Sequence, residues 1–266
     1  MRASLGGAAA GVLGLPAVAE AKRRTTVFVA GDSTAATYAI ADIPRAGWGQ
    51  ALPVFLRHDV AVVNGALSGA SSKSFADLGR LDLILAAIRP GDTLLVSFGH
   101  NDEKVEDPAR GTDPWTTFQD YLRLYLDGAR AAHARPVLVT PVERRRFRAD
   151  GTPYLSHGEY PDAMRALAEQ TGTPLIDLTA LSFDLWSKLG PETTKDYFLW
   201  LDAGISPNYP DGVADNTHFQ AHGAIEVARL VVAEGCTIPG RDTRALHDPA
   251  IPDDVLTWPV TRPAES

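Results

Sequence analysis

The feature that most constrains the fold is a regular alternation of short apolar runs with helical segments after residue 24. Five runs are rich in β-branched residues, have the length of strands, and lack an apolar–polar alternation. Unbroken apolar strands are typical of parallel sheets that helices cover on both faces. The runs are residues 26–30, 60–63, 93–98, 136–140 and 174–178.

Helical patterns separate these runs. They cover residues 48–56, 78–88, 114–133, 160–171 and 221–234. We expect the longest helix to begin at Pro114, with Asp113 as its N-cap. We expect Gly172 to be the C-cap of the helix over residues 160–171. Strand–helix alternation of this kind predicts an α/β fold: a three-layer α/β/α arrangement around a central parallel sheet of about five strands.

The chain divides by composition into three parts. Residues 1–24 hold Arg2, a weakly apolar Ala/Gly-rich stretch and small-residue cleavage patterns, which indicates a signal peptide or a disordered extension. We expect one domain over residues 25–239 and a C-terminal tail over 240–266 that wraps the surface or is loose. A signal peptide predicts a secreted or periplasmic protein, with a cytoplasmic location as the alternative.

Composition excludes several classes of function. The net charge of −8 argues against a nucleic-acid partner, which would favour clustered cations. The single cysteine, Cys236, excludes an internal disulfide framework and a multi-cysteine metal site. After residue 24 no stretch approaches the ~18 apolar residues that span a bilayer, so we expect no membrane partner. We also expect the protein to be a monomer.

Polar clusters follow the predicted strands. In an open α/β sheet, ligands bind beyond the carboxyl ends of the strands, so these clusters should converge at one edge. They are Gly31-Asp32-Ser33-Thr34, Asn64 to Gly69, Gly99-His100-Asn101-Asp102 and, before the last helix, Asp215-Asn216-Thr217-His218.

The residue types in these clusters suit nucleophilic catalysis. A serine hydroxyl such as Ser33 becomes nucleophilic when a base takes its proton, and histidine is the usual base. His218 can take that role, and Asp215, three residues earlier in the same predicted loop, can fix its tautomer. His222 competes with His218, because an i, i+4 histidine pair shares a helix face and could instead bind metal.

An oxyanion hole completes this chemistry. The backbone N–H of Ser33, the N–H of Gly69 and the side-chain amide of Asn101 can donate to the developing negative charge. Gly65 is a rival to Gly69, since the register of the second loop is open.

These four clusters taken together resemble the sequence blocks of the SGNH (GDSL-like) hydrolases, whose sheet is flavodoxin-like. Further stretches resemble the rhamnogalacturonan acetylesterases over most of residues 26–234: GDSTAATY, GWGQ, FGHNDE, TPVERRRF, HGEYPDAMRALAE and DNTHF. The resemblance implies Ser33, Asp215 and His218 as catalytic triad, and Ser33, Gly69 and Asn101 as oxyanion hole. It implies removal of acetyl groups from the pectin backbone without a metal or an organic cofactor.

One position departs from that family. The second block often has an arginine where this chain has Ala70, which leaves the catalytic residues untouched but affects the polysaccharide contact. Candidates for substrate binding are His100, Arg144 and Arg145, because a guanidinium fork matches a galacturonate carboxylate.

Three alternative functions can be weighed against this resemblance: hydrolysis of other esters, hydrolysis of phosphoesters and carbohydrate binding without catalysis. An SGNH esterase could act on acetylated xylan, an oligosaccharide or a small acyl ester. A metallophosphoesterase would need more Asp and His at strand ends, and no G-x-S-x-G motif of the α/β-hydrolases is present. A non-catalytic carbohydrate-binding protein with an enzyme fold is the alternative from another class, with Trp48, Trp115, Trp186 and Trp200 as sugar-stacking candidates.

Overall fold

The computed structural model describes residues 24–234 and 238–261. Its main sheet has five parallel strands in the order β3-β1-β4-β5-β6. The strands are β1 (Thr25–Gly31), β3 (Val60–Asn64), β4 (Thr93–Ser97), β5 (Arg135–Val139) and β6 (Leu175–Ile176). Counted in chain order these strands run 2-1-3-4-5, the order of flavodoxin-like folds, so the predicted fold class is confirmed.

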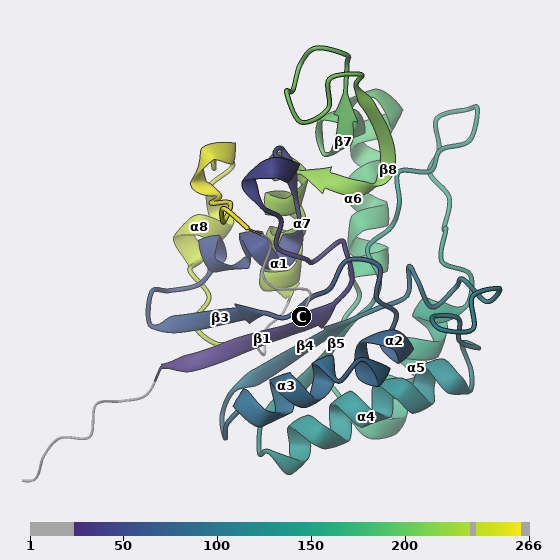
Figure 1. The fold of residues 1–266 in the computed structure, drawn as a ribbon, viewed down its shortest axis with the longest axis vertical. Coiled ribbons are helices and arrows are strands. Elements are labelled where there is room, and N and C mark those ends of the chain that lie inside the picture. The colour runs from purple at the N-terminus through teal and green to yellow at the C-terminus, as the bar shows by residue number, and fades with distance from the viewer. Residues whose placement is uncertain (1–23, 235–237, 262–266) are drawn as a thin grey trace, which may run out of the picture.

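Helices cover both faces of the sheet (Figure 1). One face carries α1 (Trp48–Ala51), α6 (Leu178–Thr193) and α7 (Ala221–Glu234), and the other carries α2 (Ser72–Asp77), α3 (Arg80–Ala87), α4 (Thr117–Ala131) and α5 (Tyr160–Thr171). The inner strand β1 supplies side chains to both cores in turn, since successive side chains point to opposite faces. Val27 and Val29 pack with α1 and α7, whereas Phe28 and Ala30 pack with α3 and α4.

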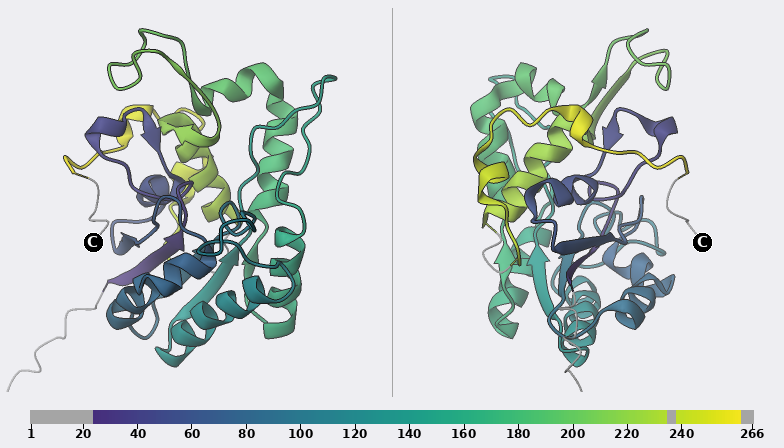
Figure 2. Two further views of the ribbon diagram at one scale, coloured as in Figure 1. Left: turned by 45° about the vertical axis from the view of Figure 1, so that its right-hand side comes forward. Right: turned by 90° about the vertical axis from the view of Figure 1, so that its left-hand side faces the viewer.

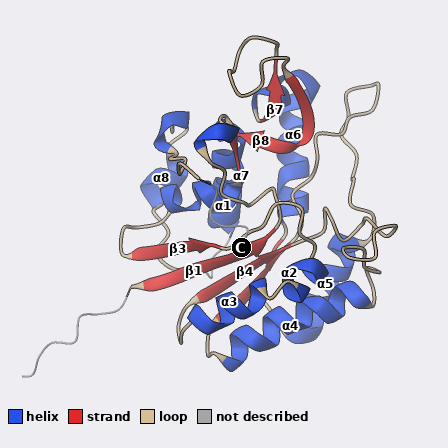
Figure 3. Ribbon diagram, in the orientation of Figure 1, coloured by secondary structure: helices blue, strands red, loops and turns tan. Residues whose placement is uncertain are grey.

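A second, three-stranded antiparallel sheet lies on the side of α1 and α7 (Figures 2 and 3). Its order is β2-β8-β7, with β2 at Arg45–Ala46, β7 at Phe198–Leu201 and β8 at Val213–Gln220. The segment Asp215–His218, predicted as a loop, therefore lies in a strand. The polar sequence of this segment does not predict a strand. It forms one because β8 pairs with β7 and β2 in the folded chain.

Three predicted helices have different bounds. Residues 48–56 split into α1 and a 3-10 helix, η2 (Leu52–Phe55), because Pro53 cannot continue the α-helical hydrogen bonds. Gly79, in the left-handed region at φ 71°, separates α3 from α2, which the sequence did not predict. α4 begins at Thr117, because Asp113 instead accepts hydrogen bonds from Trp115 and Thr116 in a turn. α6 was also missed.

The described part of the tail packs on the domain. It includes α8 (Thr243–His247), and the buried side chain of Leu256 joins the core beside α7. Trp258 Nε1 donates to the Arg45 carbonyl at 2.9 Å, and the Pro259 carbonyl accepts from Ile40 N–H at 2.9 Å. The predicted leader, apart from Arg24, and Cys236 lie outside the described residues. Within residues 24–234 and 238–261, no helix is long and apolar enough to cross a membrane.

Candidate active site

Ser33 lies in a tight turn directly after β1. The buried carboxylate of Asp32 accepts hydrogen bonds from the backbone N–H and hydroxyl of Thr34, at 2.8 and 2.7 Å. On the other side, the Tyr38 hydroxyl donates to the Ser33 carbonyl at 2.7 Å. Burial raises the pKa of Tyr38 to about 12, so it remains a donor. The Ser33 backbone is thus fixed at the carboxyl edge of the sheet.

Three predicted residues form one hydrogen-bonded chain. His218 Nε2 lies 2.9 Å from Ser33 Oγ, and His218 Nδ1 lies 2.6 Å from Asp215 Oδ2. A carboxylate accepts, so Nδ1 carries the proton and Nε2 faces the serine as acceptor. His222 lies elsewhere: its ring packs on Tyr197, 4.5 Å between centroids, and its Nδ1 is 3.5 Å from Asp253.

Asp215 is held in its charged form. Burial alone would raise its pKa, but the His218 side chain and the backbone N–H groups of Thr217 and His218 donate to the carboxylate and lower the pKa to about 2. At neutral pH Asp215 is therefore ionised. It can orient the imidazole and stabilise an imidazolium.

The three predicted oxyanion donors, Ser33, Gly69 and Asn101, line one cavity. The N–H groups of Ser33 and Gly69 have no hydrogen-bond partner within the described ranges, and Gly69 has a φ of 81°. Gly65 N–H instead donates to the Val29 carbonyl at 2.9 Å, so the sheet already uses it. This geometry favours Gly69 over Gly65 as an oxyanion donor.

The amide of Asn101 has a defined orientation. Lys104 Nζ, which can only donate, lies 2.8 Å from Asn101 Oδ1, and Asn101 Nδ2 donates to the Ala70 carbonyl at 2.9 Å. The amide nitrogen has two hydrogens. One is used on Ala70, and the second is left for a substrate oxygen.

Asp102 ties the third block to the start of α2. Its buried carboxylate accepts from the backbone N–H and, at short range, from the hydroxyl of Ser72, and also from Thr112 Oγ1 at 3.3 Å. Burial raises its pKa to about 7, and the hydrogen bonds from Ser72 oppose the rise only in part.

The predicted binding residues have different surroundings. Arg144 lines the cavity, but a short ion pair joins it to Glu103, and it also contacts His157 Nδ1 at 3.3 Å. His100 is 4% exposed, packs against His157, and has both ring nitrogens shielded without a hydrogen-bond partner. Burial lowers the pKa of His100 well below its usual value, so the ring is neutral.

Arg145 does not line this cavity. It donates to Asn216 Oδ1 at 3.0 Å and to the Pro191 carbonyl, and its guanidinium lies 4.5 Å from the ring centroid of Trp200. These contacts place Arg145 in the support of β7 and β8.

The cavity around Ser33 has a volume of about 280 Å³. This is near the lower end for ligand sites, which suits a small acyl group and the sugar that bears it. Its lining consists of Ser33, Arg45, Ser68, Gly69, His100, Asn101, Lys104, Arg144, Thr217 and His218. Sequence reasoning missed Arg45 and Lys104; Lys104 lies two residues after the third block, in the loop that follows β4, and that position was an available signal.

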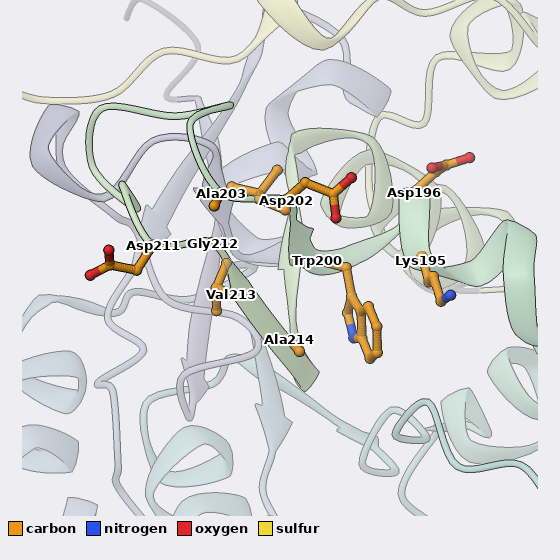
Figure 4. A pocket seen from close by; sticks show the side chains of 10 residues that line it. Lys195, Asp196, Trp200, Asp202, Ala203, Asp211, Gly212, Val213 and Ala214 are labelled. Carbon is orange, nitrogen blue, oxygen red and sulfur yellow. The ribbon is translucent and has the colours of Figure 1, made fainter.

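A larger cavity of about 660 Å³ lies along β7 and β8 (Figure 4). Trp200 and Lys195 line it together with three carboxylates, Asp196, Asp202 and Asp211. No cluster of three or more His, Cys, Asp or Glu side chains placed to hold a metal occurs in the described part of the chain.

The chain is similar in sequence to known esterases over most of its length. Residues 29–224 match the model of the GDSL-like Lipase/Acylhydrolase family. The chain is 49% identical over 214 residues to rhamnogalacturonan acetylesterase RhgT of Bacillus subtilis, covering 80% of this chain and 90% of that protein. It is 40% identical over 208 residues to the probable rhamnogalacturonan acetylesterase YesY of the same organism, covering 77% and 89%.

A solved structure shows the same fold. The crystal structure of protein YXIM from Bacillus subtilis superposes with a TM-score of 0.70 at 32% identity, over 82% of this chain and 58% of that one. The chain therefore belongs to the GDSL-like lipase/acylhydrolase family. It is a serine esterase, as the four sequence blocks predicted.

Proposed function

We propose that this esterase removes O-acetyl groups from rhamnogalacturonan through an acetyl-enzyme on Ser33. The observation that carries the proposal is the chain Asp215–His218–Ser33, with contacts of 2.6 and 2.9 Å. Beside it lie the N–H groups of Ser33 and Gly69, which have no partner among the described residues, and the second hydrogen of Asn101 Nδ2. The substrate rests on the 49% identity to RhgT, which is named a rhamnogalacturonan acetylesterase. The small cavity supports acetyl over a long acyl chain.

In the first half of the reaction, His218 Nε2 takes the proton of Ser33 Oγ, and the oxygen attacks the acetyl carbonyl. The tetrahedral oxyanion accepts hydrogen bonds from the N–H groups of Ser33 and Gly69 and from Asn101 Nδ2. Collapse breaks the ester bond, and His218 returns the proton to the leaving sugar oxygen. Asp215 stabilises the imidazolium throughout.

In the second half, His218 takes a proton from water, and the hydroxide attacks the acetyl carbonyl on Ser33. The same three donors receive the negative charge. The acyl bond breaks, the proton returns from His218 to Ser33 Oγ, and acetic acid leaves and releases its proton to the solvent as acetate. All bonds and protons balance without a cofactor.

The test is acetate release from acetylated rhamnogalacturonan by the wild type and by Ser33→Ala, with acetylated xylan as control substrate. We expect release from the pectic substrate and its loss in Ser33→Ala. Equal release from xylan would remove the pectic assignment and keep the serine mechanism. Wild-type rates in Ser33→Ala would overturn the mechanism, and no release from any ester would favour a binding protein.

We also propose that the protein acts outside the cytoplasm. The basic and apolar composition of residues 1–24 and a polymeric substrate support this location. Amino-terminal sequencing of the protein from the extracellular or periplasmic fraction should give a start near residues 20–22. An intact Met1 in the cytoplasm would contradict the proposal.

A further inference from the structure

We propose that the active-site cavity contains a carboxylate subsite formed by Arg45, and that this subsite selects acetylated sugars that carry or adjoin a uronate. The inference rests on the proposed function and names a specificity-determining residue for it. It also moves the carboxylate contact away from Arg144 and Arg145.

Arg45 is fixed beside the nucleophile by its neighbours. Its guanidinium carbon lies 4.3 Å from the ring centroid of Tyr38, whose hydroxyl bonds to the Ser33 carbonyl. Its backbone pairs with Gln220 of β8, two residues beyond His218, and its carbonyl accepts from Trp258. A cation held in place before binding loses little conformational freedom when a ligand arrives.

Among the described residues, no carboxylate balances the charge of Arg45. No carboxylate of residues 24–234 or 238–261 lies within ion-pair distance of it, and its Nε is buried without a hydrogen-bond partner. Of the other cations on the cavity wall, Arg144 is paired with Glu103, and Lys104 donates to Asn101. A guanidinium presents parallel donors that match the two oxygens of a carboxylate.

The rest of the molecule offers a uronate little attraction. The net charge of −8 repels a polyanion, so binding needs a local cation. The larger cavity carries Asp196, Asp202 and Asp211 (Figure 4). Its tryptophan, Trp200, already has Lys195 and Arg145 over the ring, at 5.1 and 4.5 Å. The cavity with Arg45 is therefore the one suited to a carboxylate.

The experiment measures kcat/KM for acetylated rhamnogalacturonan oligosaccharides with free uronates, and for the same oligosaccharides after methyl esterification of the carboxyls. In the wild type we expect free uronates to be preferred. In Arg45→Met the ratio of the two values should fall roughly 10- to 100-fold, the range of a charge-assisted hydrogen-bonded pair. Arg45→Lys keeps the charge without the fork, and its ratio should fall between the two.

A merely structural Arg45 would give another result. If it only supports Tyr38 and Ser33, Arg45→Met would slow both oligosaccharides and 4-nitrophenyl acetate by one common factor, and the ratio would stay unchanged. That outcome, or a wild type indifferent to methyl esterification, overturns the subsite. Arg89→Met, an exposed arginine just before β4 at the opposite edge of the sheet, is the matched control and should leave all rates unchanged.

Failure of the proposed function looks different. It would appear as a wild type that hydrolyses 4-nitrophenyl acetate through Ser33 but releases no acetate from either oligosaccharide. Inhibition of 4-nitrophenyl acetate hydrolysis by digalacturonate gives a readout independent of turnover. We expect inhibition of the wild type, weaker inhibition of Arg45→Met, and none by the dimethyl ester; equal inhibition of wild type and variant would count against Arg45.

Discussion

At the scale of single residues, the site depends on directional hydrogen bonds. Asp215 uses one carboxylate oxygen on the backbone N–H groups of Thr217 and His218, and the other on the imidazole. The same residue thus shapes the middle of β8 and sets the histidine tautomer. In the proposed mechanism, loss of the His218 ring removes the base, whereas loss of the Asp215 charge removes only the orientation of the base.

We therefore expect His218→Ala and Asp215→Asn to differ in severity. By analogy with other serine hydrolases, kcat should fall about 10⁶-fold for the first and about 10⁴-fold for the second. Steady-state acetate release with Ser33→Ala as the zero reference checks this. A wild-type kcat in Asp215→Asn would show that the contact to His218 Nδ1 has no part in catalysis.

Asn101 and Lys104 should act as one unit. Asn101→Ala is expected to lower kcat by roughly 100- to 1000-fold with little change in KM, because the donor acts on the transition state. Lys104→Met frees the amide to turn and should lower kcat less, by about tenfold.

In the double variant, Lys104→Met should add no further loss to Asn101→Ala, since there is no amide left to orient. Additive losses would mean that Lys104 contacts substrate independently. An effect of Asn101→Ala on KM alone would assign Asn101 to substrate binding.

At the scale of elements, buried polar groups join the blocks to one another. Asp102 links the loop after β4 to the first turn of α2, and Tyr160 of α5 donates to the Asp102 carbonyl at 2.9 Å. α2 follows directly from the loop that carries Gly69, so Asp102 links the segments of the two proposed oxyanion donors Gly69 and Asn101. This link places a carboxyl group in the protein interior, where burial destabilises its charged form.

The raised pKa of Asp102 predicts that the free energy of unfolding depends on pH. The folded pKa of Asp102 is about 7 against an ordinary 3.8, so between these values the folded state binds a proton that the unfolded state releases. Stability from this group therefore falls as pH rises from about 4 to about 7 and is level above. Asp215 titrates outside that window, since its contribution is lost only as pH falls from 3.8 through about 2.

Asp102→Asn should remove this slope, because the amide is neutral at every pH. The measurement is urea unfolding of wild type and variant at pH 4, 5.5 and 7. The free energy of unfolding of the variant should gain on the wild type with rising pH. A constant difference across the range would contradict the raised pKa.

At the scale of the whole molecule, the C-terminal segment completes the domain. Leu256 is 5% exposed within the core beside α7, and Ile251 and Trp258 pack against the same core. Trp258 and Pro259 also bond to the segment around β2 that bears Arg45. The tail therefore supports both the core and one wall of the cavity.

Deletion of residues 240–266 should therefore destabilise the protein. Burying one Leu side chain contributes about 1.5–3 kcal/mol, and several apolar side chains are lost, so we expect the free energy of unfolding to fall by at least about 2 kcal/mol. Leu256→Ala should give part of this loss. Denaturant unfolding measures both, and an unchanged midpoint for the deletion would show that the tail does not pack in solution.

The sequence by itself determined the sheet, the two helical layers and the residues at the strand ends. Continuous apolar runs can be satisfied only by burial on both faces, and the carboxyl ends of parallel strands share one edge. Ser33 and Asn101 are local to those ends, so their convergence followed from the pattern, whereas the choice of Gly69 over Gly65 needed the hydrogen bond of Gly65 to Val29.

The tertiary structure decided what depends on contacts between distant segments. β2 and β8 carry no strand signature, and they are ordered by pairing with each other and with the apolar strand β7. Whether an arginine has a charged partner depends on its neighbours in space. Glu103 neutralises Arg144, Asn216 and Pro191 accept hydrogen bonds from Arg145, and Arg45 lines the cavity with no carboxylate of residues 24–234 or 238–261 in ion-pair distance. Partners separated by 40 residues or more leave no periodic trace in a sequence, so charge balance in the site could be read only from the folded chain.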